Sequence, residues 1–213
     1  MGVTLYGYRY SVYLRIARLA LLEKGVPWDH VEIDPFADTI PADYLALQPF
    51  GRVPTLVHDD FVLYETTAIT RYVDDALPGR PLQPSDARRR ARMNQIIAVV
   101  DAYGYWPMVR QVFVQRVFNQ ARGSKADEAV LAEGLLASRR VLATVEDMAT
   151  GGEFLAGDAL SLADLHLGAM MAYFAAAEEG AAELRAFPKL DAWWQTLKGR
   201  ESLALTEPGL PAA

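Results

Sequence analysis

The strongest constraint on the fold is the order of patterns in the first 33 residues. Val3–Tyr6 is an apolar run that ends at Gly7, which is typical of a strand. Apolar residues then recur with helical spacing over residues 12–22, and Gly25 is a candidate C-cap. Trp28–Ile33 is a second strand-like run. Because the crossover between the two runs is short, we expect a βαβ unit with parallel strands.

The following segment predicts a hairpin and a helix. Thr55–His58 and Phe61–Tyr64 are rich in strand-forming residues, and two aspartates between them indicate a tight turn. A short helix is predicted over Pro41–Leu47, and a longer one over Thr66–Leu77. The complete order, βαβ followed by ββα, is that of a thioredoxin-like domain.

A stretch rich in proline and glycine divides the chain. Pro78, Gly79, Pro81 and Pro84 break regular structure, so we predict domains at 1–79 and 87–213 with a linker at 80–86. No strand pattern follows, and the candidate helices cover residues 87–122, 125–149, 162–179 and 189–198. Pro107 is expected to kink or split the first of these helices. The predicted fold class is therefore α/β followed by all-α, with a thioredoxin-like domain and a helical bundle.

Composition excludes several classes of function. The net charge of −6 offers no basic surface for nucleic acid. The absence of cysteine rules out thiolate metal sites and cysteine redox chemistry, and it suits a reducing compartment such as the cytoplasm. His30, His58 and His166 lack the spacing of metal ligands, so we expect no metal. We also expect neither a signal peptide nor a membrane span, because no run approaches about 20 apolar residues.

Three segments resemble the soluble glutathione transferase family, in matching order and spacing across nearly the whole chain. The first is Leu5–Pro27, the second joins Gln48–Leu56 (QPFGRVPTL) to Leu63–Ile69 (LYETTAI), and the third is Leu155–Asp164 (LAGDALSLAD). The first segment is most similar to serine-type members, such as the plant phi class and several bacterial groups. The resemblance implies a cytoplasmic homodimer that binds glutathione and attaches its thiolate to hydrophobic electrophiles.

Ser11, at the start of the first predicted helix, matches the residue that activates the thiol in serine-type members. Lowering a thiol pKa of about 8.5 by two units needs roughly 2.7 kcal/mol. A hydroxyl donor can supply about 1.5–3 kcal/mol of this, and a helix N-terminus about 0.3–1 kcal/mol. Locally, Ser11 is also a good N-cap. Because Val12-Tyr13 departs from the residues that usually follow this serine, Tyr6 and Tyr8 stay as alternatives.

The resemblance assigns two further turns to glutathione. Val53-Pro54 matches a cis-proline turn, at which the backbone of Val53 pairs with the cysteinyl part of glutathione. Glu65 and Thr66 match an acidic and hydroxyl pair at a helix start, which holds the γ-glutamyl end. Locally, Pro54 could be an ordinary trans-proline, and Thr66 could be only an N-cap.

The binding of the glycyl carboxylate is less clear in the sequence. Where related serine-type enzymes carry a basic pair, this chain has Thr39-Ile40, and Arg52 is the nearest substitute. Arg52 could equally be a solvated loop charge. This departure leaves weak glutathione affinity or a modified thiol ligand open.

Aromatic residues predict the site of the second substrate, between the two domains. Tyr103 and Trp106 lie three residues apart, so they can share a helix face and form an apolar wall for a flat electrophile. Tyr8 and Tyr13 complete the predicted pocket. The aromatic residues that follow Trp106 are better explained as helical core.

Ser161-Leu162-Ala163-Asp164 predicts a capping box, which is a structural motif. The loss of such a cap would cost roughly 1–2 kcal/mol, which is the effect that we predict for Asp164→Ala.

Three functions fit this sequence. The first is glutathione conjugation, with peroxide reduction through glutathione alone as a related activity. The second is a glutathione-dependent isomerase, but such enzymes carry a Ser-Ser-Cys-like run where this chain has Tyr10-Ser11-Val12. The third is a non-catalytic ligand-binding or assembly module. The enzyme is favoured because the chain has no partner domain beside the two predicted ones. The non-catalytic module is favoured because a cation for the glycyl carboxylate is missing at Thr39-Ile40.

Overall fold

The computed structural model describes residues 2–211, which divide into two compact units. The first unit runs to Leu82 and also contains Leu205–Pro208. The second unit consists of residues 83–204 and 209–211. The sequence did not predict that Leu205–Pro208 would lie with the first unit.

The first unit is built on a four-stranded sheet with the order β2-β1-β3-β4. The strands are β1 (Val3–Gly7), β2 (Asp29–Glu32), β3 (Thr55–His58) and β4 (Phe61–Tyr64). β1 pairs with β2 in parallel and with β3 antiparallel, and β3 and β4 form the hairpin. The predicted thioredoxin-like plan is therefore confirmed.

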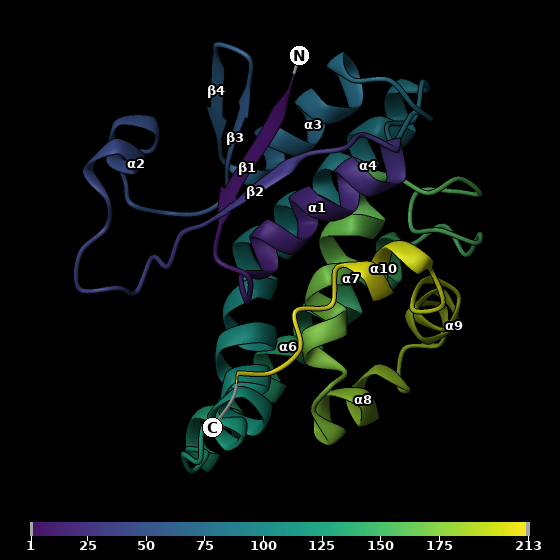
Figure 1. The fold of residues 1–213 in the computed structure, drawn as a ribbon. Coiled ribbons are helices and arrows are strands. Elements are labelled where there is room, and N and C mark those ends of the chain that lie inside the picture. The colour runs from purple at the N-terminus through teal and green to yellow at the C-terminus, as the bar shows by residue number, and fades with distance from the viewer. Residues whose placement is uncertain (1, 212–213) are drawn as a thin grey trace. The chain divides into compact units, whose positions relative to one another are not determined.

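Three helices accompany the sheet, namely α1 (Val12–Lys24), α2 (Ala42–Leu47) and α3 (Thr66–Ala76). α1 and α3 pack against each other beside the sheet, whereas α2 lies apart from them (Figure 1). Gly25 ends α1 in the left-handed region, with φ of 68°, where glycine meets no steric penalty. The core between the helices and the sheet contains Leu5, Leu56 and Ile69, all fully buried.

The second unit is all-helical, as predicted. Its elements are α4 (Ala87–Val99), η1 (Val100–Phe118), α5 (Asn119–Ala121), α6 (Glu128–Met148), α7 (Leu162–Phe174), α8 (Glu178–Leu184), α9 (Pro188–Leu197) and α10 (Glu201–Leu205). The segment η1 has π-helical winding, and both α6 and α7 pack against it.

The helix predicted over residues 87–122 changes from α to π winding at Val100, and it is not split at Pro107, which lies inside η1. The single helix predicted over 162–179 was wrong, because α7 ends at Phe174 and α8 begins at Glu178. Gly180 of α8 lies so close to the carbonyl of Phe174 that a side chain there would clash.

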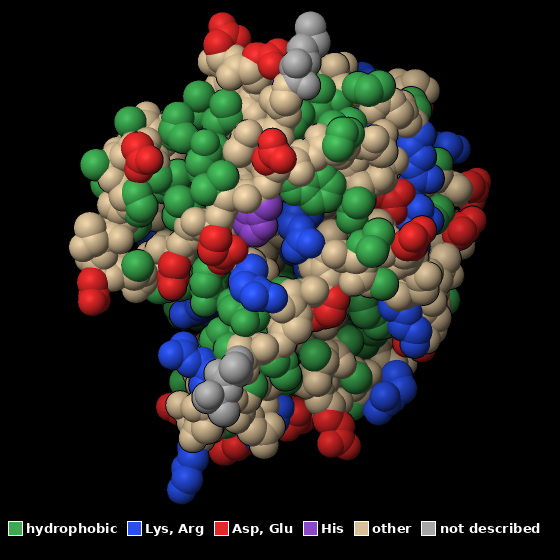
Figure 2. All heavy atoms as spheres, viewed as in Figure 1, with side chains coloured by type: hydrophobic (Ala, Val, Ile, Leu, Met, Phe, Trp, Pro, Cys, Tyr) green, Lys and Arg blue, Asp and Glu red, His purple; other side chains and the backbone are tan. Residues whose placement is uncertain are grey.

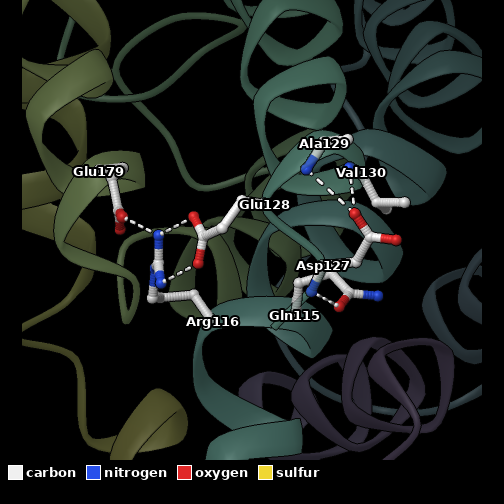
Figure 3. Close-up of polar contacts among 7 residues, drawn as sticks. All are labelled: Gln115, Arg116, Asp127, Glu128, Ala129, Val130 and Glu179. Carbon is white, nitrogen blue, oxygen red and sulfur yellow. Dashed lines mark hydrogen bonds and ion pairs between the residues drawn. The ribbon is translucent and has the colours of Figure 1, made fainter. Parts of the chain in front are cut away.

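Charged groups hold the turn between η1 and α6 (Figure 3). The Arg116 guanidinium bonds both oxygens of Glu128, at 3.0 and 2.9 Å, and lies 2.6 Å from Glu179. Asp127 accepts hydrogen bonds from two amides of the first turn of α6. This cap explains why α6 begins at Glu128 and not at the predicted residue 125.

The predicted capping box is present at the start of α7. The Asp164 carboxylate is fully buried and accepts hydrogen bonds from Ser161 N and Ser161 Oγ, both at 2.7 Å. It also accepts bonds from Leu155 N at 2.8 Å and from Trp193 Nε1 at 2.9 Å. Asp164 therefore links the loop at Leu155, the start of α7 at Ser161 and Trp193 of α9, whereas a local cap would contact only the start of its own helix.

Candidate functional site

Ser11 caps α1 through one of its lone pairs. Its backbone is extended, with φ of −74° and ψ of 122°, and its Oγ accepts the Leu14 amide at 3.3 Å. Because a serine hydroxyl has one proton in addition to its lone pairs, capping leaves that proton available to a ligand. The cap and the predicted thiolate donor are therefore compatible roles for the same side chain.

A tight turn that carries several aromatic rings leads from β1 to Ser11. The Ser11 amide donates to the Tyr8 carbonyl at 2.8 Å, which closes the turn. The Tyr8 ring lies 5.4 Å from that of Tyr10 and 5.9 Å from that of Phe36, edge-on in both cases. Tyr6 lies within β1, opposite β3. Of the two alternative donors, Tyr6 and Tyr8, it is Tyr8 that shares a turn with Ser11.

The Val53–Pro54 peptide bond is cis, as predicted. Tyr44 of α2, only 2% exposed, holds the chain on both sides of it. The Tyr44 hydroxyl donates to the Arg52 carbonyl and lies 3.0 Å from Thr55 Oγ1. Burial raises the pKa of the Tyr44 phenol, so it stays protonated as a donor. Tyr44 thus holds the cis-proline turn in place, a role that the sequence did not predict.

We predict that Tyr44→Phe loosens this turn. The free energy of unfolding should fall by about 1–2 kcal/mol, because the Arg52 carbonyl loses its donor. KM for glutathione should rise about threefold or more, with kcat little changed, if the turn binds the backbone of glutathione, as the family resemblance implies, and not the reacting sulfur. Steady-state kinetics and denaturant unfolding would measure both effects.

Tyr72→Phe is the matched control. Its hydroxyl bonds His58 Nδ1 at 2.8 Å, on the same sheet but away from the turn. That variant should keep the wild-type KM. If both variants left KM unchanged, Tyr44 would have no part in binding glutathione.

The start of α3 has a strained residue and no side-chain cap. Glu65 occupies the cap position with φ of 69° and ψ of 115°, an uncommon conformation for a residue other than glycine. The Glu65 side chain makes no capping hydrogen bond to the first amides of α3. Thr66 is therefore the first helical residue and not the N-cap, and it is 7% exposed. Strain of this kind concentrates at functional sites, and a helix N-terminus suits an anion.

Arg52 projects from the turn before β3 as an exposed side chain. Other cations of this unit are engaged: Lys24 lies 3.1 Å from Asp74, and Arg80 lies 2.8 Å from Glu23. Within residues 2–211, no ion pair or hydrogen bond of the Arg52 side chain is found. Arg52 is therefore an available cation beside the cis-proline turn.

The residues predicted for the second substrate lie in different units. Tyr8 and Tyr13 belong to the first unit, and both are partly exposed. Tyr103 and Trp106 lie on η1 of the second unit and are 67% and 61% exposed. Further along η1, Phe113 is buried, in agreement with its interpretation as core.

Residues 2–211 contain no group of three or more histidine, cysteine or acidic side chains that could hold a metal ion. None of the helices formed by these residues is long and apolar enough to cross a membrane.

Known proteins match this chain along its length. The family model for the N-terminal domain of glutathione S-transferase matches residues 5–81, and that for the C-terminal domain matches residues 105–201. Glutathione S-transferase F13 of Arabidopsis thaliana is 30% identical over 217 residues, which cover 100% of this chain and 98% of the relative.

Solved structures agree with these sequence matches. The apo form of glutathione S-transferase III superposes with a TM-score of 0.85 at 29% identity, covering 100% of this chain and 99% of that one. The maize glutathione S-transferase I in complex with an atrazine glutathione conjugate gives a TM-score of 0.83 at 29% identity, covering 97% and 96% of the two chains.

Proposed function

This chain belongs to the glutathione S-transferase family, and we propose that it conjugates glutathione to hydrophobic electrophiles. One observation carries the proposal. The first unit combines two donor groups: the Ser11 hydroxyl at the start of α1, whose proton the cap does not use, and the N-terminus of α3, which the Glu65 side chain does not cap. The Ser11 hydroxyl suits a thiolate, and the N-terminus of α3 suits a carboxylate.

Each part of glutathione has a proposed partner in the first unit. The Ser11 hydroxyl would donate to the sulfur and so lower the thiol pKa. The backbone of Val53, which lies two residues before the first paired residue of β3, would bond the cysteinyl part as an added strand edge. Thr66 and the amides of α3 would hold the γ-glutamyl carboxylate, and Glu65 its ammonium group. Arg52 would bind the glycyl carboxylate.

The electrophile would be flat and apolar. In the second unit, the proposed contacts are Tyr103 and Trp106 of η1, because their exposed rings can stack on a ligand. The maize enzyme that was solved with an atrazine conjugate supports this class of substrate. Reduction of peroxides by glutathione is a second reaction that the same thiolate could carry out.

We also propose that the protein acts as a cytoplasmic homodimer. Apolar side chains gather on the side of the first unit that carries β3, β4 and α2 (Figure 2). The first unit also exposes three phenylalanines: Phe36 is 64% exposed, Phe50 68% and Phe61 45%. Exposed aromatic groups of this kind are typical of protein interfaces, and they support burial against a second copy.

A non-catalytic binding module is the second candidate. The observation in its favour is that Thr39-Ile40 supplies no cation where related serine-type enzymes carry a basic pair. Ile40 instead packs beside Gly51, at the base of the turn before β3. The affinity for glutathione would then depend on Arg52 alone at this end.

Turnover and binding measured on the same protein distinguish the two candidates. We expect conjugation of 1-chloro-2,4-dinitrobenzene by glutathione to be faster than the uncatalysed reaction, with the rate proportional to protein concentration. Retention on immobilised glutathione without turnover would establish the binding module instead. Neither turnover nor retention would refute both candidates.

A further inference from the structure

Leu205–Pro208, which we call the strap, packs on the first unit although residues 83–204 separate it from that unit in the chain. Thr206 is fully buried, and Pro208 is buried as well, whereas Leu205 and Glu207 are exposed. This alternation shows that one side of the strap is docked. In Figure 1 the strap follows α10 and runs past the first turn of α1.

Arg15 of α1 is the main attachment of the strap. Its side chain is only 3% exposed, and it donates to Thr206 Oγ1 at 3.3 Å through Nε and to Glu207 Oε2 at 2.9 Å through Nη2. Burial of a guanidinium is costly unless an acidic group and hydrogen-bond acceptors compensate for its lost hydration. The strap therefore supplies groups that Arg15 requires.

Two more arginines hold the backbone of the strap. Arg18, also on α1, donates to the carbonyls of Leu205 at 3.2 Å and Thr206 at 3.4 Å. Arg9, which lies before α1, donates to the carbonyl of Pro208 at 3.3 Å. The strap is thus bound by Arg9, which precedes Ser11 in the sequence, and by Arg15 and Arg18, which follow it.

These attachments converge on the segment that carries Ser11. The Arg15 amide donates to the Ser11 carbonyl at 3.0 Å, so Arg15 lies one helical turn from Ser11. On the other side, the Arg9 amide donates to Glu32 Oε1 at 2.9 Å. Arg9 and Arg15, which lie on either side of this turn, are thus both bonded to the strap.

We propose that the strap fixes the position of Ser11, and that Arg15 is a positioning residue for the thiolate. The proposal rests on the function proposed above, in which Ser11 donates to the glutathione sulfur. A hydroxyl stabilises a thiolate only when it is held within hydrogen-bond reach, and displacements of about 1 Å can lower rates about 100-fold. Loosening the strap should therefore weaken thiol ionisation without removing any group that touches glutathione.

The test uses Glu207→Gln and the double variant Thr206→Val/Glu207→Gln, with Glu201→Gln as the control. Glu207 is 55% exposed, so its replacement should leave the protein folded. Glu201 is an exposed glutamate at the start of α10. Three quantities are measured: amide hydrogen exchange over residues 9–14, the apparent pKa of the bound glutathione thiol from its ultraviolet absorbance, and kcat/KM against pH.

We expect exchange over residues 9–14 to accelerate about tenfold in the double variant, because local opening becomes easier. The apparent thiol pKa should rise by about half a unit or more, and kcat should fall about threefold or more, with KM for the electrophile within a factor of about two. Glu207→Gln should show the same changes to a smaller extent, and Glu201→Gln should behave as wild type.

Unchanged exchange in the double variant would overturn the proposal. So would faster exchange combined with an unchanged thiol pKa and kcat, because the strap would then be only structural. A wild type without turnover would refute the proposed function, and the exchange measurement would still decide whether the strap holds this segment.

Discussion

Replacing Ser11 with alanine is expected to lower kcat/KM for conjugation by about 100-fold or more. The Ser11 hydroxyl caps α1 through a lone pair and keeps its proton for the thiolate, so the variant loses a charge-assisted hydrogen bond to the sulfur. The apparent pKa of the bound thiol should rise toward that of the free thiol, about 8.5. The loss of rate should therefore be greatest at low pH and smaller where glutathione ionises unaided.

Because Ser11→Ala also removes a helix cap, it needs a control for lost stability. Asp86→Ala serves this purpose, since Asp86 caps α4 by accepting the Arg89 amide at 2.9 Å. Both variants should lose about 1 kcal/mol of unfolding free energy, but only Ser11→Ala should lose activity. If Ser11→Ala kept full activity, Ser11 would be only a cap, and Tyr8 would become the first candidate for the thiolate donor.

The largest loss of stability is expected from Asp164→Ala. A lost helix cap alone would cost roughly 1–2 kcal/mol, but the fully buried Asp164 carboxylate accepts hydrogen bonds from four donors. Burial raises the pKa of Asp164, and these donors oppose that shift. Without the carboxylate, the donors of Leu155, Ser161 and Trp193 are left buried without their acceptor. We therefore expect a loss of about 3–5 kcal/mol.

Denaturant unfolding monitored by circular dichroism would measure this loss. Asp127→Ala is the control, because Asp127 caps α6 from an exposed position and should cost about 1 kcal/mol. Equal losses in the two variants would show that Asp164 acts only as a cap. A specific decrease in activity beyond that caused by unfolding is not expected, because Asp164 belongs to the capping box and not to the proposed glutathione site.

The parts of the fold that local patterns determine could be predicted from the sequence. The bounds of β3 and β4 agree with the predicted runs, because the alternation and the turn are local. The same holds for α1, which runs from a serine cap to a glycine cap. The candidate site came from resemblance, and the structure confirms the cis bond at Val53–Pro54.

The parts that depend on distant contacts could not be predicted. Tyr44 is the one buried residue of α2, and its partners, Arg52 and Thr55, belong to another segment. Nothing in the sequence predicts the strained backbone of Glu65, because a glutamate does not ordinarily adopt positive φ. The sequence does contain one feature that points to the strap. Arg15 lies among the apolar residues of α1, and a buried arginine requires a partner from elsewhere in the chain.

The strap also has a consequence for how the protein is synthesised. The first unit leaves the ribosome before the second, but its complete set of contacts includes residues 205–208, which are made after the whole intervening segment 83–204. Until then, Arg15 has neither Thr206 nor Glu207 as a partner. The thioredoxin-like unit can therefore reach its final state only after the helical unit has been translated.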